Sequence, residues 1–198
     1  MTRYDGAWRL LRMVLTPVVV ILLRPRVRGR ENVPAAGPAL LVSNHRSFWD
    51  IPLLGAVQPR TLRFMAKSEL FGFRPVGRFL AWGGAFPVRR GLPDRQALRT
   101  VHDTMVEGGV VAIFIEGTRH VNLEQAKAGA GRLAVVEGVP VVPVALRGTD
   151  RWRPGRRVSV AFGPPRLHSR NGRRTGQASR ETSAELLERI RGLYEGLE

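Results

Sequence analysis

The sequence predicts a single α/β domain in which a largely parallel mixed sheet is flanked by helices, with one more helix at the N-terminus. Three observations predict it. Short apolar segments typical of strands alternate with helical stretches along the chain. Charged residues gather where several predicted strands end, as they do in open parallel sheets. The 198 residues, 43% of them hydrophobic, are enough for one sizeable core.

Residues 1–30 are an apolar and basic segment that we expect to precede the folded domain, residues 31–198. A helix that crosses a bilayer needs roughly 20 apolar residues, and the uncharged run over 13–23 is about half that length and contains Pro17. Arginines stand on both sides of the run. The pattern is typical of a helix lying in the interface of an anionic membrane. A helix packed on the domain is the alternative.

The first strand and helix of the domain enclose a polar stretch. Residues 39–42 are a short apolar run that predicts a buried strand, and residues 51–57 are a second apolar run that predicts a helix. Residues 61–66 predict the next strand. A third short strand is predicted over 83–91 and ends in two arginines.

An aromatic and apolar cluster, broken by glycine and proline, lies between the second and third of these strands. We expect it to form an irregular helix that covers a pocket, with packing in the core as the alternative. The cluster consists of Phe71, Phe73, Val76, Phe79, Leu80 and Trp82.

The second half of the domain continues the alternation. Residues 94–107 have apolar side chains at helical spacing, and 110–115 are apolar throughout, which is typical of a buried strand. A helix over 129–137 and strands over 139–146 and 158–162 follow.

Two details of this half follow from its residue types. The helix over 129–137 should turn Leu133, Val135 and Val136 inward. Pro140 and Pro143 should confine their strand to a sheet edge or to strand ends, because proline cannot donate to a ladder.

The closing helix is predicted from a capping box. Thr182 and Glu185 have the spacing of that motif, and the helix should run to about Tyr194. Before it, residues 147–180 contain ten arginines and one acidic residue.

The composition points to an anionic partner. The chain has 32 Lys and Arg against 16 Asp and Glu, a formal charge of +16, which suits nucleic acid, anionic lipid or a phosphorylated substrate. There is no cysteine, so disulfides and thiolate chemistry are excluded. The four histidines are scattered, which disfavours a zinc site.

His45 and Asp50 lie at the first strand-to-helix junction. A tight turn can bring the carboxylate of Asp50 against one ring nitrogen of His45 and leave the other nitrogen free to accept a proton. A satisfied turn with a capping aspartate is the alternative.

A second charged group, residues 116–119, follows the strand over 110–115. Because the ends of parallel strands meet at one edge of a sheet, we expect His45, Arg89 and Glu116 to face one crevice.

Four segments in this order resemble the four sequence blocks of the glycerolipid acyltransferases, the family of 1-acyl-sn-glycerol-3-phosphate acyltransferase. They are Asn44-His45-Arg46-Ser47 through Asp50, then residues 84–89, 114–119 and 139–144. The resemblance covers about residues 31–146. Ile115 stands where the family usually has proline, and the loop over 120–127 is shorter than in the family.

The resemblance implies transfer of a fatty acyl group from acyl-CoA or acyl-carrier protein to the free hydroxyl, expected to be sn-2, of a lysophospholipid. It implies lysophosphatidic acid as acceptor, phosphatidic acid as product, no metal or other cofactor, and a peripheral or monotopic place on the cytoplasmic face of the cell membrane. His45 would be the general base and Asp50 its orienting partner. The implied substrate-binding residues are Lys67, Arg89, Glu116, Gly117, Thr118 and Arg119.

Two other classes of protein remain as alternatives. A non-enzymatic basic protein would bind nucleic acid or an anionic membrane through the arginines of residues 147–180, although no recognised nucleic-acid motif is present. A hydrolase would use Ser47 or Ser43, but the sequence has no Gly-x-Ser-x-Gly elbow.

Overall fold

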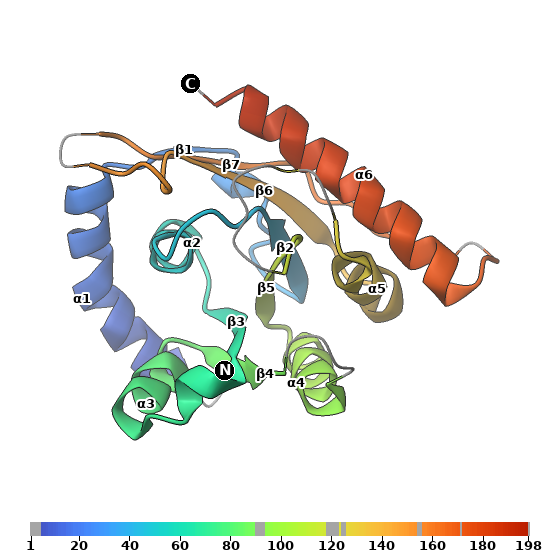
Figure 1. Ribbon diagram of the computed structural model, residues 1–198, viewed down its shortest axis with the longest axis horizontal. Helices are drawn as coiled ribbons and strands as arrows, with labels where there is room; N and C mark the ends of the chain where they lie inside the picture. Colours follow the sequence, from blue (N-terminus) through green and yellow to red (C-terminus); the bar gives the residue numbers. More distant parts are fainter. Residues whose placement is uncertain are drawn as a thin grey trace.

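The computed structural model describes residues 5–89, 94–117, 123, 126–153, 156–170 and 172–197. Its strands are β1 Arg26–Arg28, β2 Ala39–Ser43, β3 Leu62–Lys67, β4 Ala85–Val88, β5 Val110–Phe114, β6 Val141–Arg147 and β7 Ser159–Phe162. They form one seven-stranded sheet in the order β1-β7-β6-β2-β5-β3-β4 (Figure 1). β6 and β7 are antiparallel, and the other neighbouring pairs are parallel. The predicted α/β class with a largely parallel mixed sheet is confirmed.

Helices cover both faces of the sheet (Figure 1). They are α1 Asp5–Leu23, α2 Asp50–Val57, α3 Arg74–Trp82, α4 Arg95–Val106, α5 Ala128–Glu137 and α6 Thr175–Glu195, with short 3-10 helices η1 Arg30–Asn32 and η2 Ser68–Phe71. Leu23 of α1 and Leu53 of α2 belong to the core on one face. Val101 of α4, Leu133 of α5 and Leu186 of α6 belong to the core on the other. Because β2 is buried along its whole length, its sequence shows no polar alternation.

Pro143 lies inside β6, an interior strand, so the expected sheet edge or strand end is wrong for Pro143, whereas Pro140 directly precedes β6, at a strand end as expected. β6 pairs with β2 on one side and with β7 on the other. The carbonyl of Pro143 accepts from the amide of Gly163 at 2.8 Å, and the nitrogen of a strand residue points to the same side as its carbonyl. The missing N–H therefore faces the region just beyond the end of β7. The ladder between β6 and β2 loses no hydrogen bond.

α6 begins at Thr175 rather than at Thr182, so the predicted capping box is wrong. Thr182 is buried inside the helix, together with Ser179 and Ser183. The Ser183 hydroxyl accepts from the Gly131 amide of α5 at 2.9 Å and donates to the Lys127 carbonyl at 3.0 Å. These small polar residues let α5 and α6 approach closely, whereas in the sequence alone they look like a helix start.

Two further details differ from the sequence-based expectations. β1 was not predicted, because Arg26 and Arg28 are exposed and Val27 is the one apolar residue of this edge strand. Val136 is exposed, although Leu133 and Val135 of the same helix are buried as expected.

The aromatic cluster forms η2 and α3, but its aromatic side chains are not core residues. Phe73, Phe79 and Trp82 are exposed, while Phe71 and Leu80 pack against the core in part. Val76 is exposed as well, so the alternative of packing in the core is wrong for four of the six residues.

α1 packs against α2 through Val19 and Leu23, which are buried. Its opposite side is also apolar, with Leu10, Met13 and Ile21 exposed. None of the described helices combines the length and apolar character needed to span a bilayer.

Candidate active site

The charged residues predicted from the sequence lie at one edge of the sheet. β2, β5, β3 and β4 are parallel neighbours, so their C-terminal ends meet at the same edge. His45 and Glu116 follow β2 and β5, Lys67 ends β3, and Arg89 follows β4. The ends of β2 and β4 are three strand spacings apart, about 14 Å, so Arg89 lies across the edge from His45.

His45 and Asp50 are buried and in contact. The Nδ1 atom of His45 lies 2.9 Å from Oδ2 of Asp50, and both side chains are withdrawn from solvent. Because a carboxylate only accepts hydrogen bonds, a neutral His45 has its proton on Nδ1 and leaves Nε2 as the acceptor. This is the arrangement that a general base needs.

Asp50 also fixes the backbone of the turn that bears His45. The same Oδ2 atom accepts from the amides of Arg46 at 2.6 Å and Ser47 at 2.8 Å. The two interpretations of the sequence, an oriented imidazole and a satisfied turn, are therefore geometrically compatible. One carboxylate orders both the ring and the loop.

Glu116 holds the same turn from the neighbouring strand. Its Oε2 atom accepts from the backbone amide of His45 at 3.0 Å, and Glu116 is buried. The ladder between the two strands continues past their ends, where the amide of Ile115 donates to the carbonyl of Ser43 at 2.9 Å. The family resemblance implies that Glu116 binds substrate, and the structure shows in addition that it supports the backbone of His45.

Two supporting residues were not predicted. Phe114 stacks on the His45 ring, with centroids 3.9 Å apart and planes 15° from parallel. Asn44 is fully buried, and its side-chain amide exchanges two 2.8 Å hydrogen bonds with the backbone of Leu146 in β6. Asn44 therefore ties the end of β2 to the next strand. A polar residue directly after a buried strand was the signal for it in the sequence.

The candidate phosphate-binding residues Lys67 and Arg89 have exposed side chains, unlike the buried His45 and Asp50. The ammonium of Lys67 lies 3.1 Å from a carboxylate oxygen of Glu69, and both side chains are exposed. The guanidinium Nε of Arg89 lies 3.7 Å from Asp94, whose carboxylate also accepts from the Arg89 amide at 2.9 Å. That amide bond and others from the first turn of α4 lower the pKa of Asp94. Thr118 and Arg119 lie outside the described residues.

Gly117 forms the turn after β5. Its φ is +68°, which favours glycine, and its amide donates to the carbonyl of Phe114 at 3.0 Å. Backbone amides in such a turn are candidate donors to the oxyanion that forms during acyl transfer, one of the steps that the family resemblance implies. Because the Gly117 amide is already paired, it is not positioned for that role in this structure.

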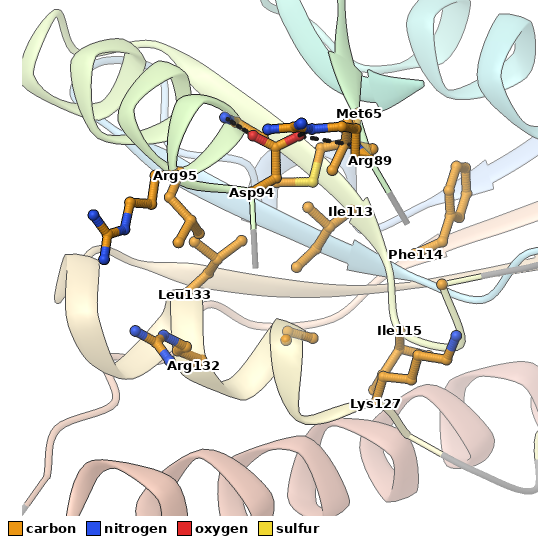
Figure 2. A pocket seen from close by; sticks show the side chains of 16 residues that line it. Met65, Arg89, Asp94, Arg95, Ile113, Phe114, Ile115, Lys127, Arg132 and Leu133 are labelled. Carbon is orange, nitrogen blue, oxygen red and sulfur yellow. Dashed lines mark hydrogen bonds and ion pairs between the residues drawn. The ribbon is translucent and has the colours of Figure 1, made fainter. Parts of the chain in front are cut away.

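A cavity of about 620 Å³ opens beside this turn, between α4 and α5 (Figure 2). Met65, Ile113 and Leu133 contribute apolar walls to it. Its lining also includes four cationic side chains, those of Arg89, Arg95, Lys127 and Arg132. No residue of α3 is among those that line it, so α3 does not cover this cavity.

Lys127 is a further residue that the sequence did not reveal. Its side chain lies over Gly117, with Nζ 3.3 Å from the point where a Cβ atom of residue 117 would stand. Its backbone is held by Ile115, whose carbonyl accepts from the Lys127 amide at 2.9 Å. The site therefore offers a cation directly beside the turn after β5.

Comparisons with known proteins find similar sequences over much of the chain. A family model described as Acyltransferase matches residues 24–147. A 1-acyl-sn-glycerol-3-phosphate acyltransferase of Bacillus subtilis is 35% identical over 133 residues, which are 66% of this chain and 67% of the relative. A lyso-ornithine lipid O-acyltransferase of Pseudomonas aeruginosa is 37% identical over 113 residues, 55% of this chain and 43% of the relative.

A solved structure is similar over almost the whole chain. The crystal structure of the 1-acyl-sn-glycerophosphate (LPA) acyltransferase PlsC from Thermotoga maritima has a TM-score of 0.72 and 25% sequence identity, covering 98% of this chain and 83% of that one. The matched region spans about two thirds of the Bacillus subtilis relative but only 38% of a Brassica napus chloroplast relative.

Proposed function

The chain belongs to the acyltransferase family, as its sequence blocks indicated, and we propose that it transfers a fatty acyl group from a thioester to the free hydroxyl of a lysophospholipid. Lysophosphatidic acid is the proposed acceptor, by the similarity to 1-acyl-sn-glycerol-3-phosphate acyltransferases, and phosphatidic acid the product. The observation that supports this most is the buried contact of His45 with Asp50 at the strand-end edge.

His45 would act as the general base. Its Nε2 atom takes the proton of the lipid hydroxyl as the oxygen attacks the thioester carbonyl, and the Asp50 carboxylate stabilises the imidazolium that forms. The tetrahedral intermediate then expels the thiolate, which receives that proton from His45. One ester bond forms and one thioester bond breaks. In this scheme the Oε2 atom of Glu116 holds the His45 backbone, and a contact of Glu116 with the substrate is proposed by the family resemblance alone.

The acceptor phosphate would lie across the edge from His45. Arg89 and Lys67 end neighbouring strands there, and Lys127 adds a cation at the Gly117 turn. A guanidinium suits phosphate because it donates two parallel charge-assisted hydrogen bonds. Thr118 and Arg119 are proposed to contribute by the family resemblance alone.

The acyl donor is proposed to be acyl-CoA or acyl-carrier protein, with no other cofactor. Membrane association is proposed to be peripheral, at the cytoplasmic face, through the exposed apolar side of α1.

The rival interpretation is a non-enzymatic basic protein. It leaves the buried pair of His45 and Asp50 without a role, since anion binding through surface arginines needs neither residue.

A donor-by-acceptor screen of the purified protein tests this proposal. Acyl-CoA and acyl-carrier protein would each be offered with lysophosphatidic acid, lyso-ornithine lipid and monoacylglycerol, and products read by mass spectrometry. We expect a diacyl product with lysophosphatidic acid and less with monoacylglycerol, which lacks the phosphate that the cations would bind. Absence of transfer for every pair would contradict the proposed function, and a clear preference for lyso-ornithine lipid would overturn the proposed acceptor.

A further inference from the structure

The outer side of η2 and α3 exposes a group of large apolar side chains. The exposed fractions are 48% for Leu70, 66% for Phe73, 52% for Phe79 and 58% for Trp82. Single exposed apolar residues are ordinary on soluble proteins, but aromatic residues gathered on one short segment mark an interaction surface. These four side chains belong neither to the described core clusters nor to the lining of the cavity, so they are available to a partner.

α1 lies beside α3 and also exposes apolar side chains. A Cβ atom at Gly83, the residue after α3, would stand 3.5 Å from Cδ2 of Leu11, so the two helices are in contact, and Figure 1 shows them side by side. Leu10, Met13 and Val14 of α1 are exposed. We call the combined set, Leu10, Met13, Val14, Leu70, Phe73, Phe79 and Trp82, the apolar docking surface.

Cations accompany the apolar docking surface. Arg74 and Arg78 of α3 are exposed, and neither has an ion-pair partner in the part of the chain that the structure describes. Aromatic side chains beside guanidinium groups suit the boundary between lipid tails and anionic headgroups. The formal charge of +16 disfavours a second copy of this chain as the partner and favours an anionic surface.

We propose that α3 docks on an anionic bilayer together with α1, and that this holds the strand-end edge at the level of the lipid headgroups. η2 begins directly after Lys67 at the end of β3, and α3 leads into β4, which ends just before Arg89. Insertion of α3 into the bilayer surface would therefore fix the distance of the ends of β3 and β4 from the membrane. This proposal rests on the proposed function, because it explains how a lysolipid hydroxyl in the bilayer reaches His45.

Vesicle binding tests the docking surface. The Phe79→Ser, Trp82→Ser double variant would be sedimented with phosphatidylglycerol-containing vesicles, beside a matched control, Val136→Ser with Leu167→Ser, which removes two exposed apolar residues elsewhere on the surface. We expect the first variant to bind at least about tenfold more weakly than the wild type, because it loses two side chains that bury apolar area in lipid. The control variant should bind like the wild type. Equal binding by the two variants would overturn the proposal.

Acyl transfer provides the second readout. With lysophosphatidic acid embedded in vesicles, the Phe79→Ser, Trp82→Ser variant should be slower than the wild type, and with a water-soluble short-chain acceptor it should be equally fast. Equal loss with both acceptors would show a structural role for α3 and overturn the proposal. If the wild type transferred to neither acceptor but still bound vesicles through α3, the proposed function would fail and the docking would stand. A change of oligomeric state without a change in vesicle binding would assign this surface to a second copy.

Discussion

The His45→Ala variant is expected to transfer acyl groups about 10³-fold more slowly than the wild type, a loss of about 4 kcal/mol of transition-state stabilisation. The reason is that Nε2 of His45 would be the proton acceptor for the attacking hydroxyl, while Nδ1 is engaged with Asp50. The measurement is kcat for transfer to lysophosphatidic acid, with circular dichroism and thermal melting to show that the variant is folded. His45→Gln, which fills more of the space beside Phe114, should be equally inactive.

His102→Ala is the matched control for this prediction. His102 also contacts a carboxylate, with Nδ1 3.0 Å from Glu137, but it is exposed on α4 and follows no strand end. Its removal should leave kcat unchanged. Full activity of a folded His45→Ala variant would show that His45 is not the general base. An equal loss of kcat in the His45→Ala and His102→Ala variants would show that the effect is not specific to the histidine at the strand ends.

The Gly131→Ala variant is expected to lower the free energy of unfolding by at least about 2 kcal/mol. An added Cβ atom would stand 2.0 Å from the backbone oxygen of Ser179 and 2.7 Å from the amide nitrogen of Ser183. Backbone atoms of α6 cannot yield as a flexible side chain would, so α5 and α6 must separate. Chemical denaturation measures the effect, and the melting temperature should fall by about 4–8 °C for a chain of this size.

Gly129→Ala is the control for that prediction, because it makes the same change in the same helix. Nothing lies within 4 Å of a Cβ atom at residue 129. Alanine there should be neutral or should stabilise the protein by up to about 1 kcal/mol, through its better helix propensity. If the two variants had the same stability, the close packing of α5 on α6 would not be what requires glycine at residue 131.

The strands buried on both faces were predictable because burial determines their local composition. β2 and β5 are apolar in succession, and the sequence alone located both. The features that it missed depend on partner elements. β6 is an interior strand because it pairs with both β2 and β7, and the small polar residues that suggested a helix start at Thr182 lie inside α6, where Ser179 and Ser183 pack on Gly131.

The same distinction holds for the candidate site. His45 and Asp50 are five residues apart, so a turn alone brings them together and the spacing predicted their contact. Glu116 is 71 residues from His45, and Leu146 is 102 residues from Asn44. Those contacts depend on which strands are neighbours, which no local pattern determines. The resemblance to a family named Glu116 but could not reveal that it holds the His45 backbone.

Rescue of a His45→Gly variant by added imidazole tests the central claim most directly, namely that the basic nitrogen at residue 45 accepts the proton of the lipid hydroxyl. We predict that the folded variant is inactive, and that imidazole restores part of the transfer from acyl donor to lysophosphatidic acid in a saturable way. Restoration should follow the concentration of neutral imidazole. A folded variant that stays inactive at every imidazole concentration, or one that needs no imidazole for full activity, would contradict the account.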